Sequence, residues 1–219
     1  MLKKLSGEKI EELLETGISE FAAHGPDKAN INVIAKKSGV SVGVLYKYYK
    51  NKDDFFQACF RRSLSALNKV LEEVLNCDCK ILERAEKLIR AVQNSAKTQS
   101  NYNILYHRII AENNKQYTLF FAREIESLTA NLYSSFIKKA QENGDVRTDM
   151  DSRMLAFFFD NLLMTLQFSY CCDYYKERFE LYCGKGILSD DEKVVAELLK
   201  FFESAFTTEQ KSIPHRNPV

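Results

Sequence analysis

The chain has 219 residues, 45% of them hydrophobic and 28% charged, which is typical of a globular protein with one or two domains. Its formal net charge is only +1, so any contact with nucleic acid has to come from a local patch rather than from bulk charge. The N-terminus lacks the pattern of a signal peptide, and no apolar run reaches the roughly 20 residues that span a bilayer. These features predict a cytoplasmic protein outside the membrane.

The spacing of apolar residues predicts an all-α protein, because no convincing period-two alternation is present. No proline lies between Pro26 and Pro214 to interrupt a helix. The first helix carries an apolar stripe that ends at Phe21, with Ser6 placed to cap its start and Gly25 its end. Two short helices are expected next, between residues 30 and 49.

A longer helix is expected from Asn51, where Asp53 and Asp54 complement the helix dipole. Its apolar stripe extends over about 24 residues, or roughly 36 Å, which is long enough to connect two domains. Further helices are expected near 80–98, 102–112, 115–143, 151–172 and 190–206. We therefore predict a small N-terminal unit (1–50), a connecting helix (51–76), a larger C-terminal bundle (77–206) and a flexible tail (207–219).

The segment from Asn30 to Tyr49 has the pattern of a helix-turn-helix. Asn30 is a good N-cap, and the small side chain of Ala35 permits close approach of two helices. Gly39 supplies the left-handed backbone that a tight turn needs, and Ser41 is placed to cap the second helix. The second helix of such a motif enters the major groove of DNA.

The positive charge of the chain is concentrated on the same segment. Six lysines and no acidic residue occur between Lys28 and Lys52, a stretch that includes this segment: Lys28, Lys36, Lys37, Lys47, Lys50 and Lys52. A local excess of this kind suits binding to phosphates. Charge alone fits a solvated helical face equally well, but charge together with the glycine turn and the serine cap favours DNA.

The same residues resemble the signature of TetR-type transcriptional regulators. The resemblance covers about residues 8–56 and rests on Phe21, Gly25, Ile34, Ala35, Gly39, Val40, Ser41, Gly43, Tyr46, Tyr48, Tyr49, Lys52 and Phe55. It implies a three-helix DNA-binding domain followed by a helical ligand-binding and dimerisation bundle. It also implies a sequence-specific DNA-binding regulator, not an enzyme: a homodimeric repressor that a small-molecule effector releases from a near-palindromic operator.

The resemblance further implies roles for individual residues: Ser41, Tyr46 and Lys52 on phosphates, Gly43 at a close backbone approach, and Val42, Lys47 and Tyr48 toward bases or adjacent phosphates. Valine at both 42 and 44 departs from the family pattern, in which a polar residue is frequent. Because valine cannot donate a hydrogen bond to a base, this departure favours readout of DNA shape. The expected DNA-binding residues are Asn30, Ser41, Val42, Gly43, Val44, Tyr46, Lys47, Tyr48 and Lys52.

In the bundle, the apolar segment 154–168 and the stripe of the last helix fit a dimer seam, although a single intramolecular core would explain both. The interface candidates are Phe158, Leu162, Val195, Leu198 and Phe202. An apolar or flat aromatic effector is expected, with ordinary core packing as the alternative role of the residues concerned. The ligand-binding candidates are Tyr102, Tyr106, His107, Phe121, Asn161 and Phe168.

Two other classes of function fit parts of the sequence. The run from Gly39 to Gly43 also matches G-x-S-x-G, the nucleophile elbow of α/β-hydrolases, but that motif requires a preceding strand and a sheet. A helical pattern precedes it here, so the hydrolase interpretation is rejected. An all-α bundle protein, an enzyme with an incidental helix-turn-helix or a protein-interaction module remains as the alternative, although no convergent acid, base or metal groups are evident.

The chain has six cysteines, of which Cys77-Asp-Cys79 and Cys171-Cys172 form close pairs. Neither pair has the spacing of a structural zinc site, so no metal or other cofactor is expected. Without a secretion signal, reduced thiols are predicted rather than a disulfide framework. A thiol-based redox sensor is the alternative.

Overall fold

The computed structural model describes residues 5–75, 77, 79–111 and 115–207. In these residues it contains helices and no strand, so the prediction of an all-α fold is confirmed. The helices are α1 (Gly7–Lys28), α2 (Ile31–Lys37), α3 (Val42–Tyr48), α4 (Lys52–Leu75), α5 (Ile81–Thr98), α6 (Ser100–Ala111), α7 (Lys115–Glu142), α8 (Ser152–Cys171), α9 (Asp173–Cys183) and α10 (Asp191–Phe206), with a short 3₁₀ turn at Ile187–Ser189. The expected tail lies outside the described residues, apart from Thr207.

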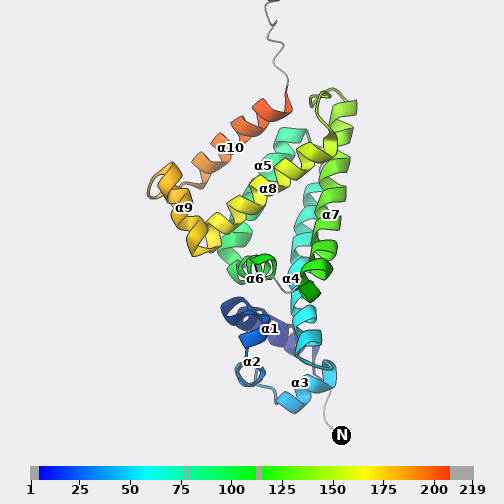
Figure 1. The fold of residues 1–219 in the computed structure, drawn as a ribbon, viewed down its shortest axis with the longest axis vertical. Helices are drawn as coiled ribbons and strands as arrows, with labels where there is room; N and C mark the ends of the chain where they lie inside the picture. The colour runs from blue at the N-terminus through cyan, green and yellow to red at the C-terminus, as the bar shows by residue number, and fades with distance from the viewer. Residues whose placement is uncertain (1–4, 76, 78, 112–114, 208–219) are drawn as a thin grey trace, which may run out of the picture.

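Helices α1, α2 and α3 gather at one end of the molecule, and α5, α8 and α10 lie toward the other (Figure 1). The long helix α4 extends from α3 into the bundle, and α6 lies between α1 and the bundle (Figure 1). Buried side chains form two clusters. One joins α1 to α4 with parts of α6 and α7, including Phe21, Phe55 and Leu105, and the other fills the bundle around Phe159 and Phe202.

Helix α1 ends later than its sequence predicts. Ser6 caps its start by accepting a hydrogen bond from the Lys9 amide at 3.2 Å. Gly25, expected to end the helix, instead forms a kink with φ 76°, and the helix resumes from Pro26 to Lys28. Proline is tolerated at this place because it stands in the first turn after the kink, where its missing N–H has no helical partner.

Helix α9 was not predicted. The sequence pattern predicts a helix that ends near residue 172 and another that begins at 190, whereas the structure places an eleven-residue helix between them. The signal is weak because α9 contributes no buried residue, so its sequence carries no clear apolar stripe. It also begins at Asp173, with only Cys172 separating it from α8, and Cys172 makes no side-chain capping bond.

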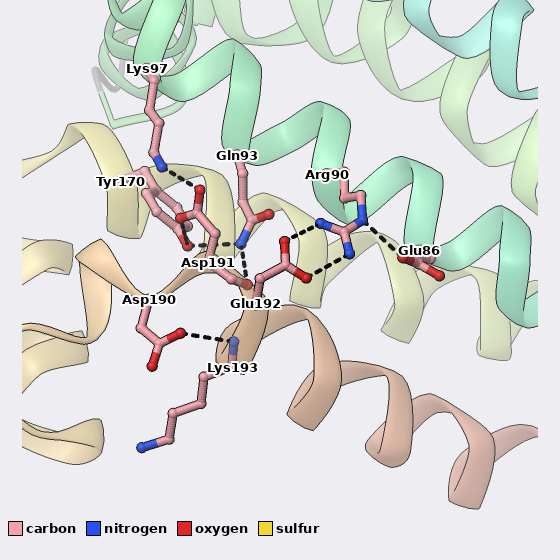
Figure 2. Close-up of polar contacts among 9 residues, drawn as sticks. All are labelled: Glu86, Arg90, Gln93, Lys97, Tyr170, Asp190, Asp191, Glu192 and Lys193. Carbon is pink, nitrogen blue, oxygen red and sulfur yellow. Dashed lines mark hydrogen bonds and ion pairs between the residues drawn. The ribbon is translucent and has the colours of Figure 1, made fainter.

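Polar contacts hold the start of α10 against α5 (Figure 2). Arg90 on α5 donates two hydrogen bonds to the Glu192 carboxylate, at 2.7 and 2.9 Å, and a third to Glu86. One turn further along α5, Gln93 donates to the Asp191 carbonyl oxygen at the start of α10, at 3.2 Å, and to the hydroxyl of Tyr170 on α8, at 2.9 Å. These contacts fix the register between α5 and α10, because a bidentate guanidinium–carboxylate pair tolerates little displacement.

The expectation of reduced thiols is wrong for one pair. Cys77 and Cys79 form a disulfide in the connection from α4 to α5, while Cys59, Cys171, Cys172 and Cys183 are free. No group of three or more potential metal ligands gathers among the described residues. In the same part of the chain, no single helix is long and apolar enough to cross a membrane, although α8 and α9, bent by 104°, pass that test as a pair.

Candidate DNA interface and internal cavity

Helices α2 and α3 form a helix-turn-helix with a capped start to each helix. Asn30 accepts a hydrogen bond from the Asn32 amide at 2.9 Å, and Ser41 accepts one from the Val44 amide at 3.2 Å. Gly39 has φ 64° in the turn between them, a conformation that a residue with a side chain rarely adopts. Local sequence therefore determines this geometry before any packing is considered.

Packing then decides which face of α3 is free. Leu45 is fully buried in the core that α1 and α4 share, and it anchors α3 at the end of the molecule (Figure 1). On the other side Gly43, Tyr46 and Lys47 are exposed, with Tyr46 at 42%. Helix α3 is seven residues long and lies at the end of the molecule (Figure 1), which suits insertion into a groove.

The remaining candidates for DNA contact differ in exposure. Asn30 and Ser41 are exposed at the starts of α2 and α3, although each side chain already serves as a cap. Val42 and Val44 are half-buried on α3. They present apolar atoms at the surface, so they offer contact area and no hydrogen bonds.

Two further side chains at the interface have partners within the chain. The ammonium of Lys52 donates to the Asp27 carbonyl oxygen at 2.7 Å, which holds the start of α4 to the end of α1. The hydroxyl of Tyr48 accepts a hydrogen bond from the Leu5 amide at 2.6 Å. Both side chains therefore hold together the reading head, which consists of helices α1 to α3 and the start of α4. They do so whatever contact they also make with DNA.

The lysine patch keeps most of its charge available. Lys37 forms an ion pair with Glu20 at 3.5 Å. The other lysines of α2 and α3 and their flanks have exposed side chains and no ion pair with a described residue; they are Lys28, Lys36, Lys47 and Lys50. Unpaired ammonium groups around an exposed helix are what a phosphate backbone binds.

A cavity of about 120 Å³ lies in the bundle and is lined by residues of α4, α5, α6, α7 and α8. Its walls are mainly apolar and include Leu67, Val92 and Leu163. Tyr102 and Tyr106, two of the candidate ligand-binding residues, both line it from α6. An apolar cavity with a few polar groups is the usual form of a small-molecule site.

Two carboxylates also line the cavity, Glu126 from α7 and Asp160 from α8. Tyr106 donates a hydrogen bond to Glu126 at 2.9 Å. Burial, followed by the charge of Glu126, raises the pKa of Tyr106 well above its usual value. Burial, with a further contribution from Glu126, raises the pKa of Asp160 to about 6. The cavity therefore carries negative charge near neutral pH.

The other ligand-binding candidates lie elsewhere. His107 and Phe168 do not line the cavity; they pack against each other with ring centroids 5.0 Å apart, and Tyr175 of α9 completes the cluster. Burial and the neighbouring Arg108 lower the pKa of His107. Asn161 faces an outer groove between α7 and α8 and donates to the Phe157 carbonyl. The side chain of Phe121 lies outside the described residues.

Helix α6 connects the cavity with the DNA-binding helices. Tyr102, which lines the cavity, donates to the Glu15 carboxylate of α1 at 2.5 Å. Burial first, and then this bond, raises the pKa of Tyr102 to about 12. Arg108 of α6 donates to the carbonyl oxygens of Ala22 and Ala23 near the kink of α1, the latter at 2.7 Å. A shift of α6 would therefore pull on α1.

The candidate dimer residues divide between core and surface. Val195 and Phe202 are 3% and 2% exposed inside the chain's own core, so their assignment to an interface is corrected. Leu162 and Leu198 are half-buried against that core. Phe158 is 45% exposed, and α8 and α10 carry further exposed apolar side chains that were not among the five named candidates: Met154, Phe157 and Phe201.

The sequence analysis also missed Glu126 and Asp160. Asp160 could have been noticed, because it interrupts an otherwise apolar stretch of α8. Glu126 gives no comparable signal among the many charged residues of α7. Their meeting in one cavity depends on how α7 and α8 pack, which residue spacing does not show.

Residues 13–59 match the family model of bacterial regulatory proteins of the tetR family. This segment spans most of α1, all of α2 and α3, and the start of α4. The chain carries the DNA-binding domain of a TetR-type transcriptional regulator. This domain explains the helix-turn-helix and makes the protein a DNA-binding regulator, as its sequence predicts.

Relatives and solved structures match the chain over a longer stretch than the family model does. The chain is 27% identical over 169 residues to the probable acrEF/envCD operon repressor of Escherichia coli K12, covering 73% of this chain and 76% of that one. The fold matches the fatty acid degradation regulator FadR of Bacillus halodurans, with 20% identity, a TM-score of 0.69 and coverage of 90% and 96%. It also matches FadR of Bacillus subtilis in complex with stearoyl-CoA, with 18% identity, a TM-score of 0.68 and coverage of 87% and 97%.

Proposed function

We propose that this regulator is a cytoplasmic homodimeric repressor that binds a near-palindromic operator and is released by a small molecule in the bundle cavity. The observation that carries the proposal is the direct connection from cavity to reading head through α6. Tyr102 touches both the cavity and Glu15 of α1. An effector that binds one arrangement of α6 better than another shifts the position of α1. The binding free energy of the operator then changes by the coupling free energy between the two sites, which cannot exceed the effector's preference for one arrangement.

The proposed division of labour follows the residue ranges expected from the sequence. Residues 1–50 bind DNA, residues 51–76 connect, and residues 77–206 bind the effector and the second subunit. Within the head, exposed Tyr46 and Lys47 would contact the duplex from α3, with the backbone at Gly43 approaching it closely. Lys52, held by Asp27, would place its charge beside the phosphates.

Dimerisation is proposed because operators of this kind contain two half-sites. Helices α8 and α10 pack together through Phe159 and Phe202, whose ring centroids are 4.7 Å apart. The exposed rings of Phe158 and Phe201 are their immediate neighbours in sequence. Exposed aromatic side chains beside a helix pair mark a surface that a second copy would cover.

DNA binding is tested with a gel-shift assay against DNA flanking the regulator's own gene, repeated over a range of salt concentrations. Lys47→Gln should weaken binding to all sequences and reduce the slope of log affinity against log salt by about 0.9, the contribution of one phosphate contact. Lys69→Gln is the matched control, since Lys69 is an exposed lysine on α4 outside the patch. Binding without salt dependence, or equal slopes for both variants, would contradict the proposed interface.

A further inference from the structure

We propose that the effector of this regulator is an apolar organic cation, which binds in the bundle cavity with its charge against Glu126 and Asp160. This inference rests on the proposed function, because it assigns a chemical class to the ligand of the proposed effector site.

The charged residues of the cavity wall are all acidic. Among the residues that line the cavity, Glu126 and Asp160 are the charged ones, and no lysine, arginine or histidine accompanies them. Asp160 accepts no hydrogen bond and forms no ion pair with any described residue, and Glu126 is held by the hydroxyl of Tyr106. Two carboxylates facing one apolar space repel each other, and a cation between them would remove that repulsion.

A second observation shows that the cavity is prepared for a polar ligand. The Asn103 side chain lines the cavity and is only 5% exposed, and its amide nitrogen has no hydrogen-bond partner. Its oxygen accepts from Gln167 at 2.7 Å, which fixes the amide in place. A buried donor without a partner is costly, so a core that served packing alone would not be expected to keep one. This nitrogen would donate to a ligand that carries an acceptor atom in addition to its cationic group, while the cationic group itself binds at the carboxylates.

Aromatic side chains complete the site for a cation. Tyr102, Tyr106 and Tyr133 all line the same cavity. The faces of aromatic rings attract cations, and cages of this type bind quaternary ammonium groups that cannot donate hydrogen bonds. Such a group suits two carboxylates inside an apolar wall better than a primary amine, whose loss of water would be more costly.

The size of the cavity and its surroundings define the ligand further. A volume of about 120 Å³, compared with the roughly 150 Å³ of an apolar cavity that holds benzene, limits the apolar part of the ligand to a short alkyl chain or one small ring. Five residues, Glu126, Thr129, Tyr133, Asp160 and Met164, also line the outer groove between α7 and α8. The carboxylates therefore stand between the cavity and the surface, where a cation would meet them on entry.

Hexyltrimethylammonium is a suitable probe, because its charge does not change with pH. Isothermal titration calorimetry without DNA compares it with 1-hexanol, hexanoate and hexanoyl-CoA, which carry a six-carbon chain with no charge or with negative charge. At about pH 7.5 we expect the cation to bind more tightly than any of these three compounds. Asp160→Asn and Glu126→Gln should each weaken its binding about tenfold or more, because each removes a buried charge partner.

The control for both variants is Glu124→Gln, which removes an exposed charge from the same helix outside the cavity and should leave the affinity unchanged. Lowering the pH from about 7.5 to about 5 should weaken binding of the cation about tenfold, because Asp160 takes up a proton with a pKa of about 6. The groups facing Asp160 are Glu126, Tyr106 and Tyr133 inside, with Lys138 and Arg153 along the groove. Because this pH dependence is assigned to the Asp160 carboxyl, Asp160→Asn should reduce it.

The inference is wrong if the cation does not bind, or if hexanol, hexanoate or hexanoyl-CoA binds more tightly than the cation. It is also wrong if neither carboxylate variant lowers the affinity for the cation. Those outcomes leave the proposed function standing, because hexanoyl-CoA or another ligand could still release DNA in the gel-shift assay. Failure of the ligand-free protein to bind DNA would instead contradict the proposed function without changing the calorimetric result.

Discussion

At the scale of single residues, Gly17 shows how closely α1 and α4 approach. A Cβ atom at this position would lie 2.6 Å from the Cys59 sulfur and 2.6 Å from the Phe55 ring. Neither neighbour can move freely, since both are fully buried and the Phe55 ring packs against Phe21 and Tyr49. Only glycine lets the two helices meet at this distance.

Gly17→Ala should therefore destabilise the protein, although alanine is the better helix former by about 1 kcal/mol. Overpacking costs about 1–3 kcal/mol, so we expect a net loss of about 1 kcal/mol, or about 2–4 °C in Tm. Differential scanning calorimetry measures it. Gly7→Ala is the matched control, because a Cβ atom there meets nothing within 4 Å. A rise in Tm for both variants would show that the α1–α4 contact adjusts without cost.

Asp160 is a residue whose charge works against folding. Burial raises its pKa to about 6 from the usual 3.8, so the folded protein holds this proton more tightly than the unfolded chain. Stability contributed by the protonated form is complete below about pH 4, is lost as the pH rises toward 6, and stays lost above it. Asp160→Asn should therefore stabilise the protein by about 2 kcal/mol at neutral pH, and by little at low pH.

Urea unfolding of wild type and Asp160→Asn at about pH 4 and about pH 7.5 checks this expectation. The variant that stabilises the fold is also the one that should weaken binding of the cation. A charge that is retained despite its cost to stability is expected at a functional site. Equal stability of the two proteins at both pH values would remove this argument for Asp160.

At the scale of elements, α6 fixes α1 through Arg108. The guanidinium donates to the carbonyl oxygens of Ala22 and Ala23, close to the kink at Gly25 where the helix cannot satisfy them internally. Hydrogen bonds from a charged donor contribute about 1.5–3 kcal/mol, and partial exposure reduces this. Arg108→Met should cost about 1–2 kcal/mol of unfolding free energy and increase hydrogen exchange in the last turns of α1.

Mass spectrometry of hydrogen exchange locates the change, and Arg178→Met serves as the control, since Arg178 is exposed on α9 over the Tyr182 ring. Faster exchange spread evenly over the whole bundle would indicate general destabilisation instead of a weakened α6–α1 joint. Loss of protection confined to α1 would identify Arg108 as part of the path from cavity to reading head.

Most elements were predictable because their signals are local. The caps at Asn30 and Ser41 and the turn at Gly39 lie within a few residues of the helices that they define, and the structure reproduces each of them. The last predicted helix, 190–206, matches α10 closely because Asp190 caps it and an apolar stripe follows. Helix α9 has neither signal. The cavity was out of reach because it joins side chains from five helices, and residue spacing does not determine how those helices cross.

At the scale of the whole molecule, the exposed apolar surface of α8 and α10 favours assembly into a dimer. Met154, Phe157, Phe158 and Phe201 are between 45% and 60% exposed, far more than the aromatic residues that form the core beneath them. Leaving such rings in water is unfavourable, at roughly 25 cal/mol for each Å² of apolar surface. Two copies joined along this surface would bury the rings and present two reading heads to one operator.

Phe158→Glu should produce a monomer, because a carboxylate at the centre of the seam would be buried against its own copy in the second subunit. Sedimentation equilibrium measures the mass, with Leu119→Glu as the control, since Leu119 is 65% exposed on α7, a helix outside the proposed seam. In the gel-shift assay the monomer should lose about a hundredfold or more in operator affinity, because linking two heads is what makes the second half-site contact intramolecular. A dimeric Phe158→Glu protein with unchanged affinity would place the seam elsewhere, whereas a monomer that binds the operator as tightly as wild type would show that a single head suffices.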